Sequence, residues 1–503
     1  MVFSSIIFLF YFLPLVLVVY YLAHLLAPRQ VKHGFLTLLS YLFYGWANPL
    51  FFVLMLTSTL IDYICGLWMS GQLGRNPSRP AGTPPGRGPR GETEVPLLEP
   101  GGTRTRRQRV ALVISICSNL SLLGFFKYFN FGMDSWNALM HALGADAATY
   151  ENFLRITLPL GISFYTFQSM SYSIDVYRGD ARAIRNWTDF SCYVSMFPQL
   201  VAGPIIRFQE VADQIKKRTH TIEKFARGAA FIGMGLTKKV LLADPCGKVA
   251  DQCFAAGSLE TMDAWFGAVA YSFQIYFDFS AYSDMAIGLG LMMGFMFAKN
   301  FDSPYISESI TEFWRRWHLS LSTWLRDYLY IPLGGNRLGA GRTYVNLMLV
   351  MLLGGLWHGA SWNFVIWGAI HGVMLAAERL QGKDSVYRKL PRAARVLVTF
   401  VIVTIAWVFF RAEDLPAALE YCASMVGLAK GHDSAMLVGG QVYTLYHTAT
   451  VLVAAAVAWF GVQTWDFTRR ITWPKALTVT ILFVLAVVML VATSFHPFIY
   501  FIF

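Results

Sequence analysis

Long apolar runs follow one another along the chain, with short polar segments between them. Runs with few or no charges include Phe3–Leu22, Ala111–Phe129, Val396–Phe410, Val451–Phe460 and Ile481–Ala492. A helix needs about 20 mainly apolar residues to cross the ~30 Å hydrocarbon core of a bilayer. The pattern therefore predicts an all-α polytopic membrane protein, which we interpret as a single membrane domain over residues 1–503.

The intervening pattern places further crossings. A hairpin near Leu36–Met69 is expected to turn at Asn48-Pro49, because Asn-Pro favours a turn. Other crossings are expected near Ile156–Val176, Phe225–Leu242, Trp265–Met296, Tyr443–Val462 and Leu477–Phe495. Segments poor in Lys and Arg are expected to be loops on the outer side of the membrane: Asp134–Glu151, Asp244–Asp263 and Glu413–Asp433.

The basic residues set the expected orientation. The formal net charge is +11, and most Lys and Arg residues lie between the apolar runs, as in Arg315–Arg342 and Arg379–Arg395. By the positive-inside rule these loops face the cytoplasm, which leaves the N-terminus on the periplasmic side of a cell inner membrane. Orientation in membrane lipid accounts for the charge, and we expect no nucleic-acid partner.

Two apolar segments have basic loops on both sides, so each is expected to enter and leave from the cytoplasm. Phe190–Ile206 is interrupted at Phe197-Pro198, which is typical of a re-entrant loop. Thr343–Ala377 divides into two arms of about 15 residues, which reach ~22 Å at 1.5 Å per residue and fall short of the far side. The turn Gly354–Ala360 then places His358 at the tip of a hairpin, deep in the membrane.

The segment Gly74–Arg109 differs from the rest of the chain. It holds seven glycines, seven prolines and eight arginines, with almost no apolar pattern. This composition predicts a disordered cytoplasmic loop.

The segment Ser307–Leu329 has helical periodicity. Its large apolar side chains recur every three or four residues: Trp314, Trp317, Leu321, Trp324 and Tyr328. Polar side chains lie on another side: Arg315, Ser322 and Arg326. The pattern predicts one amphipathic helix at the cytoplasmic interface, with aromatic anchors and basic groups at the level of the lipid head groups.

His358 is the strongest candidate for chemistry. It lies in Trp357-His358-Gly359-Ala360, where glycine lets the backbone turn and approach a ligand. An ionisable residue within a membrane is a functional candidate, and neutral imidazole accepts a proton near pH 7. The structural alternative is a histidine whose ring bonds a neighbouring carbonyl.

Other ionisable residues have both functional and structural interpretations. Arg315 near His318 can hold a diphosphate or an acidic carrier at the cytoplasmic mouth, or it can simply anchor the helix at the interface. Asp278 and Asp284 lie in an apolar crossing, where a carboxylate needs a partner. They can orient a histidine or belong to a buried hydrogen-bonded network.

The sequence contains no phosphate-binding glycine motif, nucleophile elbow or zinc motif. The six cysteines form no CxxC pair, so we expect no metal site. Direct transfer catalysed by a base is the simplest enzyme mechanism that these residues support.

Several motifs together resemble the membrane-bound O-acyltransferase family, most closely its alginate O-acetylation branch. The resemblance extends over nearly the whole chain apart from Gly74–Arg109. The motifs that carry it are Met1–Ser5, Phe164–Gln168, Asp175–Gly179, Val201–Pro204, Tyr276–Asp284, Phe313–Trp324, Gly354–Ala360 and Pro497–Phe501. The resemblance implies a ring of about 9–11 transmembrane helices with re-entrant segments and a central tunnel. It also implies that His318 and His358 are the two hallmark histidines, the second being the one usually assigned catalysis.

The resemblance further predicts a membrane O-acetyltransferase. It implies a cytoplasmic acyl thioester as co-substrate, which is acetyl-CoA or another acetyl thioester, with no bound cofactor. The expected acceptor is an exported polysaccharide, reached with periplasmic acetyl-transfer proteins. Alginate is the nearest resemblance, with cellulose or another surface glycan as the alternative. A transporter that uses Asp278, Asp284 and His358 as a relay, or a non-catalytic scaffold of a secretion complex, is the alternative from another class.

We assign the candidate site residues as follows. The catalytic candidates are His358 and His318. The substrate-binding candidates are Arg315, Trp357, Asn363, Asp278 and Ser322. A base at His358 is expected to accept the proton of the attacking hydroxyl, and a transient acetyl-histidine is the alternative mechanism.

Overall fold

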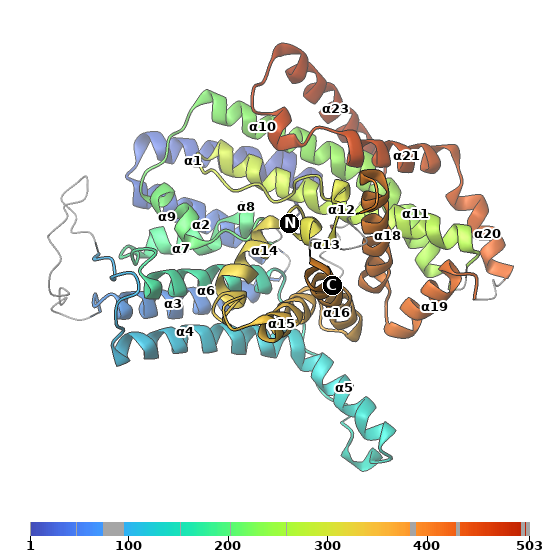
Figure 1. Ribbon diagram of the computed structural model, residues 1–503. Helices are drawn as coiled ribbons and strands as arrows, with labels where there is room; N and C mark the ends of the chain where they lie inside the picture. The colour runs from blue at the N-terminus through green and yellow to red at the C-terminus, as the bar shows by residue number, and fades with distance from the viewer. Residues whose placement is uncertain are drawn as a thin grey trace. The chain divides into compact units, whose positions relative to one another are not determined.

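The structure is a computed structural model (Figure 1), in which every regular element among the described residues is helical. It describes residues 2–46, 48–73, 95–150, 152–201, 203–257, 259–382, 389–428, 433–493 and 498. The chain forms two compact units. Unit 1 consists mainly of Phe3–Phe225 with Gly290–Phe297, and unit 2 of Ala226–Leu289 with the chain from Ala298 onward.

Within the described residues, five helical segments are long and apolar enough to cross a membrane. They are Phe8–Leu26, Phe51–Met69, Arg106–Ala142, Arg392–Arg411 and Trp473–Ala492. They confirm an all-helical, multi-pass membrane protein. The count of about 9–11 crossings, the ring, the tunnel and the single domain stay predictions.

Unit 1 begins with the predicted first crossing and hairpin. Its elements are η1 (Phe8–Phe12), α1 (Leu13–Leu26), α2 (Arg29–Gly45), α3 (Phe51–Met69), α4 (Arg106–Leu123), η2 (Gly124–Tyr128), α5 (Phe129–Ala142), η3 (Asp146–Ala148), α6 (Ile162–Arg178), α7 (Trp187–Ser195), α8 (Phe197–Leu200) and α9 (Phe208–Lys216). The chain is interrupted between α7 and α8 beside Pro198, as expected for Phe190–Ile206.

Helices α3, α4 and α6 lie side by side in unit 1 (Figure 1) around a buried polar network. The Asp62 carboxylate accepts hydrogen bonds from Ser115 Oγ at 2.5 Å and from Asn119 Nδ2 at 2.8 Å. Ser173 Oγ on α6 lies 2.7 Å from Ser115 Oγ. A buried carboxylate needs such partners, so the network fixes how these three helices pack.

Two predicted loop boundaries in unit 1 are wrong. The Thr105 side chain and the Gln108 side chain form a reciprocal capping box that starts α4 at Arg106, inside the expected loop Gly74–Arg109. Residues 74–94 of that loop lie outside the described residues. The helix that starts at Arg106 continues to Ala142, so the expected loop Asp134–Glu151 begins as helix.

Unit 2 contains the candidate site. Its elements are α10 (Ile222–Thr237), η4 (Lys238–Ala243), α11 (Asp244–Ala255), α12 (Thr261–Met292), η5 (Pro304–Ile306), α13 (Ile310–Trp314), α14 (Leu319–Leu325), η6 (Arg326–Tyr330), α15 (Ala340–His358), α16 (Trp362–Gln381), α18 (Arg392–Arg411), α19 (Leu415–Met425), α20 (Asp433–Val442), α21 (Leu445–Phe460), α22 (Thr464–Phe467) and α23 (Trp473–Ala492).

Two further loops predicted on the outer side are largely helical. Within Asp244–Asp263, α11 extends to Ala255 and follows η4 without a break, so Pro245 lies inside a continuous helix directly after the π-helical segment. Within Glu413–Asp433, the Asp414 side chain accepts from the Ala417 N–H at 2.8 Å and caps α19. Scarcity of Lys and Arg is a signal of membrane side, and it does not distinguish a loop from a helix.

The expected hairpin over Thr343–Ala377 is present as α15 and α16 (Figure 1), but its arms are longer than predicted. They contain 19 and 20 residues, which corresponds to roughly 30 Å at 1.5 Å per residue. This is the thickness of a hydrocarbon core, so the prediction that the arms are too short to reach its far side is wrong. The turn is restricted to residues 359–361, while Gly355 stays helical. A Cβ at Gly355 would lie 2.1 Å from the Phe364 carbonyl oxygen, so glycine here allows the two helices to touch.

Candidate active site

The predicted single helix over Ser307–Leu329 is broken at His318. The chain leaves α13 after Trp314, and His318 precedes α14 with φ 46° and ψ 55°. This left-handed conformation costs a non-glycine residue about 1–3 kcal/mol and is found where the surroundings enforce it. Here the Leu319 N–H donates to the Asn300 carbonyl at 2.9 Å, which ties the break to the segment after α12.

The amphipathic character of the segment is confirmed despite the break. Trp317, Leu321, Trp324 and Tyr328 are buried, whereas Arg315 and Arg326 are exposed. The apolar face therefore packs into unit 2, and the prediction that these aromatic side chains are anchors at the lipid interface is wrong. The break turns the His318 side chain inward with it, and this side chain is fully buried.

The His318 imidazole lies among aromatic rings and neutral polar groups. Its centroid is 4.6 Å from the Phe279 ring of α12, at an interplanar angle of 90°. Nδ1 lies 3.2 Å from Asn300 Oδ1 and 3.3 Å from Ser320 Oγ. Nε2 is buried without a hydrogen-bond partner among the described residues. Burial lowers the pKa of His318 to about 3, so the ring is neutral.

His358 is the last residue of α15, at the tip of the hairpin, and it is 5% exposed. Its ring lies 5.1 Å from Trp367 of α16 and 5.3 Å from Phe410 of α18, both edge-on. The ring of Trp357, the preceding residue of α15, lies 5.0 Å away. Three helices thus hold the imidazole in one orientation.

Trp357 joins the two predicted catalytic histidines. Its ring centroid lies 6.2 Å from His318 and 5.0 Å from His358. Two residues that are 40 positions apart in the sequence therefore border the same buried indole, which is 3% exposed. The structure brings these three predicted site residues together.

The other predicted substrate-binding residues take different positions. Arg315 is exposed and has no ion pair among the described residues. Ser322 Oγ donates to the Trp317 carbonyl at 3.3 Å. Asn363 is buried in the first turn of α16, and its Nδ2 donates to the Ala412 carbonyl at 2.9 Å. Both Ser322 and Asn363 therefore donate hydrogen bonds to backbone carbonyls of the protein itself.

Asp278 and Asp284 are each paired with a lysine. Lys239 Nζ lies 3.0 Å from Asp278 and 2.7 Å from Asp244. Lys238 Nζ lies 2.7 Å from Asp284. We did not single out these lysines from the sequence. The sequence did contain a signal for this pairing: the two lysines lie inside the apolar run Phe225–Leu242, and cations at such positions require acidic partners.

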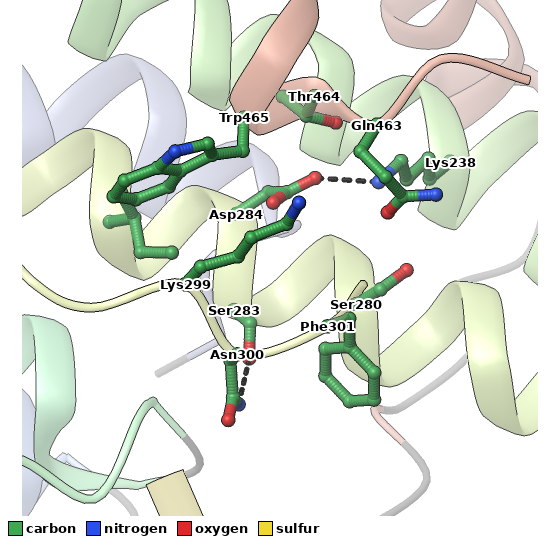
Figure 2. A pocket seen from close by; sticks show the side chains of 11 residues that line it. Lys238, Ser280, Ser283, Asp284, Lys299, Asn300, Phe301, Gln463, Thr464 and Trp465 are labelled. Carbon is green, nitrogen blue, oxygen red and sulfur yellow. Dashed lines mark hydrogen bonds and ion pairs between the residues drawn. The ribbon is translucent and has the colours of Figure 1, made fainter. Parts of the chain in front are cut away.

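A small polar pocket lies beside Asn300 (Figure 2). Its lysines are paired, Lys238 with Asp284, and Lys299 with Asp302 at 2.7 Å. On the same side, Asn300 Nδ2 donates to Ser283 Oγ at 2.7 Å (Figure 2). Asn300 thus lies between the pocket and the His318 ring.

Sequence reasoning missed Asn300, Phe279 and His371. His371 is fully buried on α16, and its Nδ1 accepts from Trp314 Nε1 at 3.3 Å. Its position on an apolar helix was a visible signal. Asn300 gave none, because an asparagine after a helix is common in any turn. Among the described residues, no group of three or more His, Cys, Asp or Glu side chains is placed to hold a metal ion.

Comparison with known proteins identifies the family. The profile of MBOAT, the membrane-bound O-acyltransferase family, matches residues 181–412. A Pseudomonas putida protein named "Probable alginate O-acetylase AlgI" is 44% identical over 100% of both chains. The chain belongs to the membrane-bound O-acyltransferase family. As a member, it is a membrane O-acyltransferase that uses an acyl donor as co-substrate.

Two other relatives extend the comparison. A protein of the same name from Pseudomonas aeruginosa is 46% identical over 92% of this chain and 82% of its own. A "Peptidoglycan O-acetyltransferase" from Helicobacter pylori is 34% identical over 85% of this chain and 80% of its own. Both histidines lie within the residues that the family profile matches. The resemblance that the motifs predicted is thereby confirmed.

Proposed function

We propose that this membrane-bound O-acyltransferase transfers acetyl groups to an exported polysaccharide of the alginate type. The observation that carries the proposal is the 44% identity along the whole length of a relative named for alginate O-acetylation. Cellulose or another surface glycan is the second candidate acceptor, since a relative named for peptidoglycan O-acetylation is also similar over most of the chain.

The proposed donor is an acetyl thioester, acetyl-CoA in the simplest case, which binds from the cytoplasmic side. Arg315 supports this proposal, because it is exposed and has no acidic partner among the described residues. Its neighbour Arg316, by contrast, pairs with Glu312 at 2.9 Å. A guanidinium with no acidic partner suits a phosphate, which it can bind through two parallel hydrogen bonds.

The proposed mechanism is direct transfer at the histidine cluster. An acceptor hydroxyl attacks the thioester carbonyl while the His358 imidazole takes the hydroxyl proton. The new C–O bond forms, the C–S bond breaks, and the proton passes from His358 to the thiolate. His318 accepts a hydrogen bond from bound substrate through Nε2. The aromatic rings around both histidines exclude water, which protects the thioester from hydrolysis.

The remaining proposals concern location and partners. The protein is proposed to lie in the cell inner membrane with its N-terminus in the periplasm, where acetyl-transfer proteins complete delivery to the polymer. The spacing of basic segments between apolar helices supports this orientation. Reporter fusions at each terminus test it, and an accessible N-terminus on the cytoplasmic side contradicts it.

Transfer of label tests the proposed function directly. The purified full-length protein in proteoliposomes, given acetyl-CoA labelled in the acetyl group and an alginate oligosaccharide, is expected to release CoA and to produce labelled saccharide. Acetylated product requires a reaction, whereas a transporter only redistributes intact label. If CoA is released without labelled saccharide, the polysaccharide assignment is wrong. Absence of both products with every thioester tested contradicts the acetyltransferase proposal.

Replacement of Arg315 by alanine is expected to raise KM for acetyl-CoA about tenfold. A hydrogen bond to a charged group contributes about 1.5–3 kcal/mol, and 1.4 kcal/mol corresponds to tenfold. The kcat is expected to change by less than about twofold, because binding of the distant phosphate is lost equally in the ground and transition states. The measurement is steady-state label transfer at varied acetyl-CoA concentration.

The matched control is Arg337→Ala, which removes another exposed arginine from the same predicted cytoplasmic side. An equal rise of KM in both variants indicates a general loss of positive charge. An unchanged KM in Arg315→Ala excludes contact between Arg315 and the donor.

A further inference from the structure

The contacts of Asn300 determine how its side-chain amide is oriented. The Ser320 backbone N–H lies 3.2 Å from Asn300 Oδ1. A backbone N–H can only donate, so the amide group facing it is the oxygen and not the NH2. On the opposite side, Asn300 Nδ2 donates to Ser283 Oγ at 2.7 Å (Figure 2). Both ends of the amide are therefore assigned by their partners.

This orientation determines the tautomer of His318. Nδ1 of the imidazole lies 3.2 Å from the same Asn300 Oδ1. The other neighbour of Nδ1, the Ser320 hydroxyl at 3.3 Å, donates its hydrogen to Asn300 Oδ1 at 2.9 Å. An amide oxygen only accepts, so Nδ1 carries the hydrogen. A neutral imidazole has one N–H, which leaves a lone pair on Nε2. That nitrogen is buried and has no hydrogen-bond partner among the described residues.

No charged group competes with this arrangement among the side chains of the described residues that face the ring. They come from α12, the segment after it, α14 and α15: Phe279, Asn300, Phe301, Ser320 and Trp357. Burial alone lowers the pKa of His318, so the neutral form is kept. A buried acceptor without a partner costs free energy, which a bound N–H or O–H group would recover.

Asn300 also stabilises the unusual backbone conformation of His318. The His318 φ of 46° is unfavourable for a residue with a Cβ. The Asn300 backbone carbonyl accepts a hydrogen bond from the Leu319 N–H at 2.9 Å. The Asn300 side-chain oxygen contacts the His318 ring and accepts from the Ser320 N–H. One residue therefore fixes both the backbone turn and the imidazole.

We propose that Asn300 is a positioning residue for the transfer reaction, which holds His318 as the Nδ1–H tautomer so that Nε2 accepts a hydrogen bond from bound substrate. The role in transfer rests on the proposed function, whereas the tautomer does not. Asn300 acts through His318, in the way that the carboxylate of a catalytic triad acts through its histidine, where loss of the correct tautomer costs about 10⁴-fold in rate.

The tautomer is tested without any substrate. Full-length protein labelled with 15N-histidine is measured by solid-state NMR in lipid, and the His318 signals are assigned by their loss in His318→Gln. We expect a protonated Nδ1 and an unprotonated Nε2 in the wild type. Asn300→Leu, which keeps similar volume but has no acceptor, is expected to give a mixture of tautomers or the reverse one. A wild-type ring protonated on Nε2 overturns the proposal.

The effect on reaction is tested with two variants of Asn300. In inverted membrane vesicles supplied with labelled acetyl-CoA, Asn300→Leu is expected to lower kcat by about 10²- to 10⁴-fold, with little change in KM. Asn300→Asp keeps the acceptor oxygen and is expected to retain activity within about tenfold at high pH. Aspartate has the same shape as asparagine. Activity retained in Asn300→Asp therefore shows that the loss in Asn300→Leu comes from the missing acceptor and not from a damaged fold.

The pH profile gives a readout that a purely structural role does not move. A carboxylate at position 300 stabilises the imidazolium, so the pKa of His318 rises in Asn300→Asp. Protonated His318 has no lone pair on Nε2, and activity is therefore lost as pH falls through that pKa. The acidic limb of Asn300→Asp is expected at a higher pH than that of the wild type. Identical limbs overturn the proposal.

Two serines of α12, Ser283 and Ser280, give a matched pair of alanine variants. Ser283→Ala removes the acceptor for Asn300 Nδ2 and is expected to lower kcat by about tenfold. Ser280→Ala removes a hydroxyl from the same pocket that bonds its own helix at the Phe277 carbonyl, and it is expected to leave kcat unchanged. If the wild type shows the expected tautomer but transfers no label, the proposed function is wrong and the tautomer assignment stands. If the wild type transfers label and Asn300→Leu does so equally well, the positioning role fails.

Discussion

Replacement of His358 by glutamine is expected to lower acetyl transfer by about 10²- to 10⁴-fold, the contribution typical of a general base. Glutamine preserves polarity and much of the volume, but it cannot take a proton near neutral pH. The aromatic environment from Trp357, Trp367 and Phe410 stays in place, so the protein is expected to reach the membrane at its normal level. The measurement is initial rate of label transfer, together with the acetyl content of the exported polymer.

His318→Gln is expected to give a comparable loss, because it removes the acceptor at Nε2 of the second histidine near Trp357. His141→Gln, at an exposed histidine on α5 of unit 1, is the control and is expected to retain full activity. Normal polymer acetylation in a strain that carries only His358→Gln contradicts the assignment of the base, provided that the protein level is unchanged.

Loss of the Lys239 charge is expected to be the most damaging change to stability. Lys239 and Asp278 are 4% and 2% exposed, and Lys239 also contacts Asp244. Lys239→Met leaves the Asp278 carboxylate without this cation, and breaking a buried pair in this way costs about 3–5 kcal/mol. A lower midpoint of thermal unfolding in detergent and a reduced amount of protein in the membrane are the expected observations.

A second substitution separates the charge effect from lost packing. In Lys239→Met/Asp278→Asn the more deeply buried of the two carboxylates that contact Lys239 is replaced by a neutral amide, so recovery of part of the lost stability is expected. Lys299→Met is the surface comparison, since the Lys299 and Asp302 side chains are 22% and 45% exposed and such pairs contribute only about 0–1 kcal/mol. An equally small effect of Lys239→Met contradicts the expected cost of breaking this pair.

The pairing of Asp278 bears on its predicted role in substrate binding. A carboxylate within an apolar crossing was a reason to consider function, and Lys239 now supplies the structural alternative. Both interpretations make separate predictions. A binding role predicts a change of KM in Asp278→Asn at unchanged stability, whereas a framework role predicts the reverse.

Much of the fold could be predicted, because it depends on properties of neighbouring residues. The first crossing, the hairpin of α2 and α3, the hairpin of α15 and α16, and the interruption at Pro198 follow from runs of apolar residues and from local turn residues. The errors also have a local cause. Sparse basic residues led us to expect loops at Asp134–Glu151 and Glu413–Asp433, where helix caps and helix-compatible sequences continue or start a helix instead.

The sequence predicted which residue types form the candidate site, but not which side chains contact one another there. The sequence by itself determined an all-helical membrane protein, an amphipathic segment around His318, and two histidines in motifs that resemble an acyltransferase. Only the tertiary structure decided that the Trp357 ring lies near both of those histidines, that Lys239 pairs with Asp278, and that Asn300 holds the His318 ring. The reason is that hydrophobic periodicity records which face of a helix is buried, whereas a hydrogen bond between positions 18 residues apart depends on how the chain turns between them.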